Sequence, residues 1–178
     1  MRKIEDFENV KESGSSLPKG IYLIVVVDVV DKQEKEYLEI KVDIADGEFK
    51  GFAKDAEEKF GDYPNSFIAR RSYKPTALGF FKSFTVAVEK SNPGYTWGWN
   101  EATLIGKKAV GVFDEEEYEK DGELRVSVKL REIRSIPSWK DGKVKLPGIK
   151  KLQSEKQTPP TMKNDYIIPE ITDKDLPF

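Results

Sequence analysis

The chain contains neither cysteine nor histidine among its 178 residues. Without cysteine it has no disulfide, no thiolate nucleophile and no cysteine-ligated zinc site. Without histidine it lacks the commonest general base and metal ligand. Much ordinary enzyme chemistry is therefore excluded, and we predict a protein that is not an enzyme and uses no metal or other cofactor.

Long apolar runs are also missing. The most apolar stretch, residues 21–30, is interrupted by Asp28 and falls short of the roughly 20 residues that a membrane-spanning helix needs. Arg2 and Lys3 are followed by acids rather than by an apolar core, so we expect no signal peptide. These features predict a cytoplasmic protein, and its length suits one domain and a tail.

Charge is distributed unevenly, although the formal net charge is only -2. From Ser154 onward five acids face three lysines, an excess that equals the whole net charge and leaves the preceding body neutral. Within that body, residues 125–151 carry nine basic side chains and two acids, and residues 64–88 carry four basic side chains and no acid. A solvated surface explains any one such run. Two acid-poor runs beside an acidic tail predict a binding site for a polyanion.

The first half of the chain favours β-strands. Residues 21–30 are dense in β-branched side chains, which predicts a strand buried on much of both faces. Residues 37–45 alternate apolar and polar side chains, which predicts a half-buried strand with one apolar face: Leu38, Ile40, Val42 and Ile44. A third strand is expected to begin at residues 48–52.

The second half predicts one helix and two strands. Pro75 and Thr76 can start a helix whose apolar stripe is Leu78, Phe81, Thr85 and Val88, widened by Phe80, Phe84 and Ala87. Residues 108–113 predict a short strand followed by an acidic loop, and residues 125–136 a last strand with Val126, Val128 and Leu130 facing inward.

This order, three strands, a helix and two strands, matches an all-β oligonucleotide-binding (OB) fold, a five-stranded Greek-key barrel with one helix between strands 3 and 4. A small β-sandwich or another partly open barrel is the main alternative. Residues 1–152 are the expected domain. Residues 153–178, rich in Gln, Thr, Pro, Ser and Lys, are expected to be a disordered acidic tail.

A protein that binds single-stranded nucleic acid without sequence preference needs cations that contact the phosphates and flat rings on which the bases stack. Both recur near the groove that such a barrel would form, and Trp97 and Trp99 would project on the same side of an extended segment. The candidate nucleic-acid-binding residues are Lys50, Phe52, Arg70, Arg71, Tyr73, Lys74, Trp97, Trp99, Arg125, Lys129, Arg131 and Trp139. Each ring could instead fill the core, and each cation could simply be solvated.

The last six residues, 173–178, combine acids with an extended Leu-Pro-Phe end. A terminal ring beside the α-carboxylate suits a pocket with an apolar floor and a basic rim. The candidate partner-binding residues are Asp173, Asp175, Leu176, Pro177 and Phe178.

This ending resembles the acidic tip of bacterial and phage single-stranded-DNA-binding proteins, and the body resembles those of phages and prophages of Gram-positive bacteria. The similar segments in the body are residues 7–10, 17–22, 37–40, 43–51, 71–74 and 87–95. The resemblance implies an OB fold, sequence-independent coating of single-stranded DNA during phage replication or recombination in the bacterial cytoplasm, and recruitment of replication, recombination and repair proteins by the tip.

Two other functions are open at this stage. Acids such as Asp43 with Asp46, or residues 114–117, could hold Mg²⁺ in a nuclease that works without histidine. Alternatively, the barrel could be the scaffold of an adaptor that binds only protein. Oligomeric state is not determined by these patterns.

Overall fold

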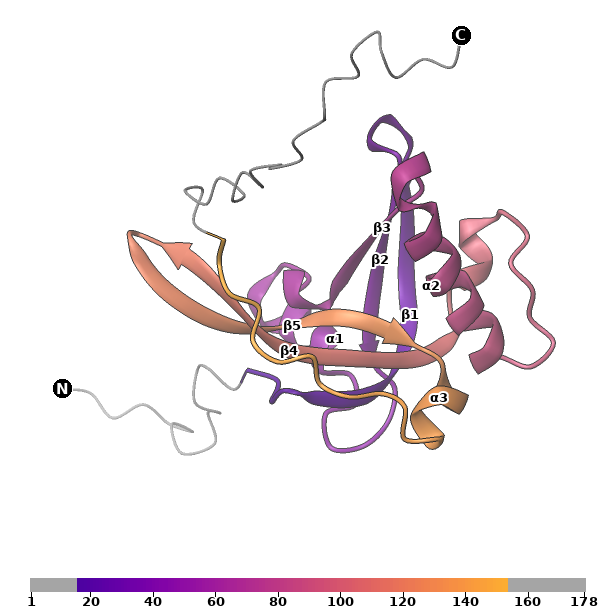
Figure 1. Ribbon diagram of the computed structural model, residues 1–178. Helices are drawn as coiled ribbons and strands as arrows, with labels where there is room; N and C mark the ends of the chain where they lie inside the picture. Colours follow the sequence, from indigo (N-terminus) through magenta and orange to yellow (C-terminus); the bar gives the residue numbers. More distant parts are fainter. Residues whose placement is uncertain (1–15, 154–178) are drawn as a thin grey trace, which may run out of the picture.

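The computed structural model describes residues 16–153, which are organised around a five-stranded antiparallel sheet (Figure 1). The spatial order of the strands is β3-β2-β1-β4-β5. Their bounds are β1 (Gly20–Lys32), β2 (Tyr37–Ile44), β3 (Ile68–Ser72), β4 (Lys108–Lys120) and β5 (Glu123–Arg134). Every pair of neighbours is antiparallel. The expectation of a five-stranded antiparallel structure is therefore confirmed.

Helices lie between several of the strands and after the last strand. The α-helices of the described residues are α1 (Phe52–Phe60), α2 (Leu78–Ser91) and α3 (Ile136–Lys140). The 3-10 helices are η2 (Gln33–Lys35), η3 (Asn65–Phe67), η4 (Pro75–Ala77) and η5 (Glu101–Leu104). The helix expected between the third and fourth strands is confirmed as α2, whereas the expectation of a single helix is wrong. Within residues 16–153, no helix is long and apolar enough to cross a membrane.

The third strand lies further along the chain than the sequence pattern predicts. Residues 46–51 form a turn and α1 follows, because Gly47 and Gly51 take left-handed backbone angles with φ of 86° and 75°. The carboxylate of Asp43 then accepts hydrogen bonds from the backbone N–H groups of Ala53 (2.9 Å) and Lys54 (3.1 Å). This cap satisfies two of the first N–H groups of α1 and fixes a helix where a strand was expected.

The fourth strand is longer than predicted. β4 continues through the acids at 114–117 to Lys120, so the expectation of an acidic loop there is wrong. The turn to β5 is Asp121-Gly122, and both residues have positive φ (56° and 76°). β1 pairs with β4 only up to Phe113. Beyond that point β4 and β5 form a hairpin that extends away from the rest of the sheet, at the left of Figure 1.

The core is formed by buried side chains of the sheet and of α2, with contributions from α1, η3 and η5. The predicted apolar face of β2 is confirmed, since Leu38, Ile40, Val42 and Ile44 are all buried. β1 is less buried than expected, because Val27 and Val30 are each 39% exposed. Val126 is also exposed, since it lies on the projecting hairpin.

Gly111 allows the centre of the sheet to close tightly. It pairs with Tyr22 of β1 and Ile133 of β5. A Cβ atom at this position would lie 2.8 Å from Cγ2 of Ile24 and 2.9 Å from Cε2 of Phe113. The absence of a side chain therefore lets β1, β4 and the buried ring of Phe113 pack together.

Candidate nucleic-acid interface

A cavity of about 580 Å³ lies between β3, α2 and β5. β3 and β5 are the two edges of the sheet, so the curvature of the sheet brings both edges to one place. We call this cavity the basic cleft, because four arginines and one glutamate are among its lining residues. The lining residues are Arg70, Arg71, Ser72, Ala77, Phe80, Ser83, Phe84, Arg131, Glu132, Ile133 and Arg134.

Arg71 is a half-buried cation of the cleft. Its guanidinium lies 5.9 Å from the centroid of the buried Phe84 ring, and its Nη1 donates a hydrogen bond to the carbonyl of Arg70 (3.2 Å). Burial lowers the pKa of Arg71, while the nearby carboxylate of Glu132 raises it. Arginine stays protonated in proteins. An incoming anion would therefore meet a cation that is already partly stripped of water.

Arg70 and Arg134 are more exposed, and each contacts a carboxylate. Nε of Arg70 lies 3.2 Å from Oε2 of Glu39 on the adjacent strand, and Nη2 of Arg134 lies 2.7 Å from Oε2 of Glu132. Exposed ion pairs contribute only about 0–1 kcal/mol. Both guanidinium groups can therefore exchange these contacts for a phosphate at small cost.

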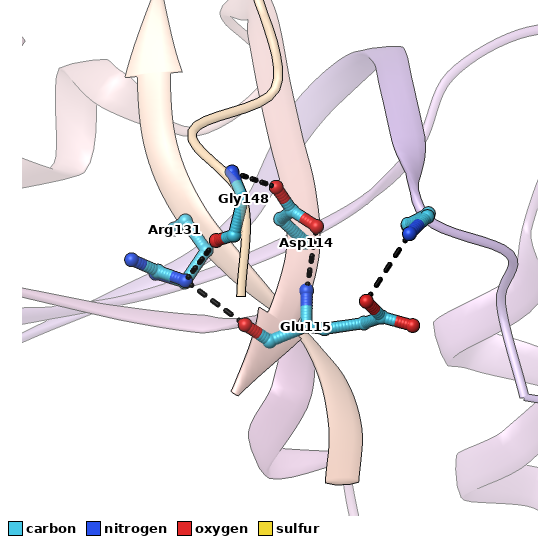
Figure 2. A network of polar contacts seen from close by, with 5 residues as sticks. Asp114, Glu115, Arg131 and Gly148 are labelled. Carbon is cyan, nitrogen blue, oxygen red and sulfur yellow. Dashed lines mark hydrogen bonds and ion pairs between the residues drawn. The ribbon is translucent and has the colours of Figure 1, made fainter. Parts of the chain in front are cut away.

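Arg131 lines the cleft and also holds the chain that follows α3 (Figure 2). Its Nη1 donates to the carbonyls of Glu115 (3.0 Å) and Gly148 (3.4 Å). The buried carboxylate of Asp114 accepts hydrogen bonds from the N–H groups of Glu115 (2.8 Å) and Gly148 (2.7 Å). Lys150 then forms a parallel bridge to Glu116. The segment 148–152 is thus fixed along the part of β4 that lies beyond its pairing with β1.

A second basic cavity of about 340 Å³ adjoins the cleft. It shares Glu132 and Arg134 with the cleft and adds Lys143 and Lys145, which follow α3. A chain of cationic side chains therefore continues from β3 across β5 to residues 143–147.

Phe80 supplies an exposed ring at the cleft. Its side chain is 77% exposed, so the prediction that it widens the buried stripe of α2 is wrong. Leu78 is also exposed, whereas Phe81, Phe84, Thr85, Ala87 and Val88 are buried as expected. A large apolar ring in water beside arginines is available to stack on a ligand.

The predicted rings of Tyr73, Trp97 and Trp99 lie together in a different cavity of about 320 Å³. We call it the aromatic cavity; its lining residues are Asp31, Gln33, Leu38, Tyr73, Phe81, Trp97, Trp99 and Glu101. The two tryptophan rings line the same space, with centroids 6.1 Å apart. The backbone is not extended at Trp99, however, where φ is 60°. The cavity lining contains two acids and no arginine or lysine.

The other predicted contact residues lie outside both cavities. Lys50 and Phe52 are not on a third strand: Lys50 is exposed in the turn before α1, and the Phe52 ring stacks on Phe67 of the core (5.6 Å between centroids). Lys74 is exposed before η4. The last three are on the hairpin and on α3: Arg125, paired with Glu123; Lys129, paired with Glu116; and Trp139, 38% exposed.

Two of the carboxylates considered for magnesium, those of Asp43 and Asp114, accept hydrogen bonds from the backbone. Asp43 caps α1, and Asp114 binds two N–H groups, as described above. Among residues 16–153, no three carboxylates gather in a way that could hold a metal ion.

Eight of the lining residues are absent from the list of candidate residues, and two of these, Arg134 and Phe80, add a cation and an exposed ring to the cleft. Arg134 belongs to the basic run at 125–151, but its place depends on a bulge at Arg131 that shifts the β4–β5 register. Phe80 stands about 100° around the helix from Phe81, a position that helical spacing assigns to the edge of the stripe. The predicted partner-binding residues at 173–178 lie outside the described residues.

No protein-family model matches the chain, and no curated protein matches it.

Proposed function

We propose that the protein binds single-stranded DNA in the basic cleft without reading its sequence, and that it is not an enzyme. The observation that carries this proposal is the meeting of four arginines and an exposed phenylalanine in one cavity. Guanidinium groups bind phosphates in a bidentate manner, and a flat ring stacks on any base. This combination favours an unpaired strand, whose bases are free to stack.

An OB barrel is the architecture that we infer for the sheet. The strand order, with α2 between β3 and β4, is compatible with a five-stranded Greek-key barrel that is partly open between β3 and β5. On this reading the basic cleft is the opening itself. A strand passing Arg134 would next meet Lys143 and Lys145, which lengthens the cationic path.

The wider role that we propose comes from the sequence resemblance. Residues 1–152 would be the DNA-binding domain, and residues 153–178 an arm whose tip recruits replication, recombination or repair proteins during phage DNA metabolism in the bacterial cytoplasm. Apart from residue 153, the arm lies outside the described residues, so its sequence alone supports this part. Deletion of residues 173–178 should leave DNA affinity unchanged or raised and abolish recruitment of these proteins.

Fluorescence anisotropy of labelled oligo-dT, titrated with the full chain, tests the proposal. We expect saturable binding that weakens as salt rises, since arginine contacts release counterions from the strand. Unlabelled single-stranded DNA should compete, whereas duplex DNA of the same length should compete poorly. Absence of binding at low salt would contradict the proposal and favour an adaptor that binds only protein. Equal competition by duplex would contradict the stacking role of Phe80.

A further inference from the structure

We propose that the aromatic cavity binds the side chain of an arginine on a partner protein. This site is separate from the basic cleft and does not depend on the proposed DNA binding. α2 contributes Phe81 to the aromatic cavity, whereas Phe80 and Phe84 line the cleft. The chain therefore presents two cavities of opposite character on either side of one helix.

Charge distinguishes this cavity from a site for nucleic acid. The charged side chains that line the cavity are those of Asp31 and Glu101. Both are acidic, so they would repel a phosphate and attract a cation. The hydroxyl of Tyr73 donates a hydrogen bond to Oδ1 of Asp31 (2.8 Å). This bond fixes the carboxylate at the cavity wall and engages one of its two oxygens, so that the other can accept from a guanidinium.

The rings supply the second half of an arginine site. Trp99 is 75% exposed and its ring is nearly parallel to that of Phe81, with an interplanar angle of 19° and 6.3 Å between centroids. The Trp97 ring is tilted by 53° to that of Trp99. Cations bind to the faces of such rings, tryptophan best of all. A planar guanidinium can stack on Trp99 while its N–H groups reach a carboxylate, which a lysine ammonium does less well.

The size and openness of the cavity favour a side chain carried by a protein. A volume of about 320 Å³ accommodates an arginine head and its aliphatic stem beside Leu38. The exposed Trp99 leaves room for the backbone that carries the side chain. The shape and charge of the cavity therefore favour a basic segment of a partner protein as its occupant.

Nuclear magnetic resonance of the full chain with ¹⁵N-labelled tryptophan tests this site. The chain has three tryptophans, and Trp139 on α3 is a built-in control because it lies outside the aromatic cavity. The probe is a blocked Gly-Arg-Gly peptide, and its control replaces arginine by citrulline, a neutral side chain of nearly the same shape. We expect the arginine peptide to shift the indole signals of Trp97 and Trp99 saturably, while the citrulline peptide binds at least about tenfold more weakly.

Matched variants locate the interaction. Glu101→Gln removes a cavity carboxylate and should weaken arginine binding several-fold, whereas Glu34→Gln, on η2 and outside the aromatic cavity, should leave it unchanged. Equal binding of the arginine and citrulline peptides, or no shift of Trp97 and Trp99, would overturn the proposal. If oligo-dT shifts both signals and displaces the arginine peptide, the rings stack on bases and the proposal is wrong. Absence of oligo-dT binding in the anisotropy assay would overturn the proposed DNA function and leave the proposed arginine site unaffected.

Discussion

Replacement of Arg71 by glutamine is the most informative single change in the basic cleft. Arg71 is partly buried against Phe84, and its Nη1 donates a hydrogen bond to a backbone carbonyl rather than to a carboxylate. A phosphate would therefore find in Arg71 a cation without a competing ion pair among the described residues. A hydrogen bond to a charged group contributes about 1.5–3 kcal/mol, so Arg71→Gln should weaken binding of oligo-dT by roughly 10- to 150-fold.

The salt dependence of binding gives a second, independent magnitude. If the four arginines of the cleft each contact one phosphate, the slope of log K against log salt should be about -3, from roughly -0.7 per phosphate on a single strand. Arg71→Gln should bring the slope to about -2, and Arg71→Lys should retain the original slope because the charge remains.

The control for Arg71 removes the same charge elsewhere. Lys59→Gln, on the exposed side of α1, should change the affinity by less than about twofold. Thermal unfolding followed by circular dichroism checks that Arg71→Gln is folded. A folded Arg71→Gln protein with unchanged affinity and slope would refute the assignment of the cleft as the DNA site.

Three further changes test the ring at the cleft, the packing of the sheet and the attachment of the last described segment. Phe80→Ala should lower the affinity for oligo-dT by the roughly 1–3 kcal/mol of one stacked base, with an unchanged melting temperature because the ring is exposed. Gly111→Ala should lower the free energy of unfolding in urea by about 1–3 kcal/mol, because its Cβ would collide with Ile24. Asp114→Ala should destabilise the fold by about 1–3 kcal/mol and speed tryptic cleavage after Lys150, because the N–H of Gly148 loses its acceptor.

For each of these three variants, the opposite result would contradict the structural explanation given for it. Full affinity of Phe80→Ala for oligo-dT would show that the ring does not stack on the DNA. A fully stable Gly111→Ala would mean that β1 and β4 can separate without cost. Unchanged proteolysis of Asp114→Ala would mean that the bonds drawn in Figure 2 do not hold the segment 148–152.

Local patterns in the sequence were sufficient to predict the elements whose pattern arises within a single strand or helix. Alternation predicted β2, and apolar spacing after Pro75 predicted α2, because both patterns arise within one element. The third strand was misplaced since the decisive contacts are not local. Asp43 caps a helix that begins nine residues later, and two glycines with positive φ set the turn between them.

Some of the candidate residues meet in the fold, but they line two cavities rather than one groove. Arg70, Arg71 and Arg131 do meet in one cavity, and Tyr73, Trp97 and Trp99 do meet in another. The sequence could not separate the two sets, because their division depends on which side of α2 each residue reaches. Adjacent residues of α2, Phe80 and Phe81, line different cavities.

Photo-cross-linking with oligonucleotides that carry 5-iododeoxyuridine tests most directly whether a single strand occupies the basic cleft. Halogenated bases cross-link to aromatic rings on which they stack, and mass spectrometry then identifies the attached residue. Occupation of the cleft predicts attachment to Phe80, reduced in Arg71→Gln and unaffected in Lys59→Gln. Attachment confined to Trp97 and Trp99, or to Trp139, with Phe80 unmodified would contradict it.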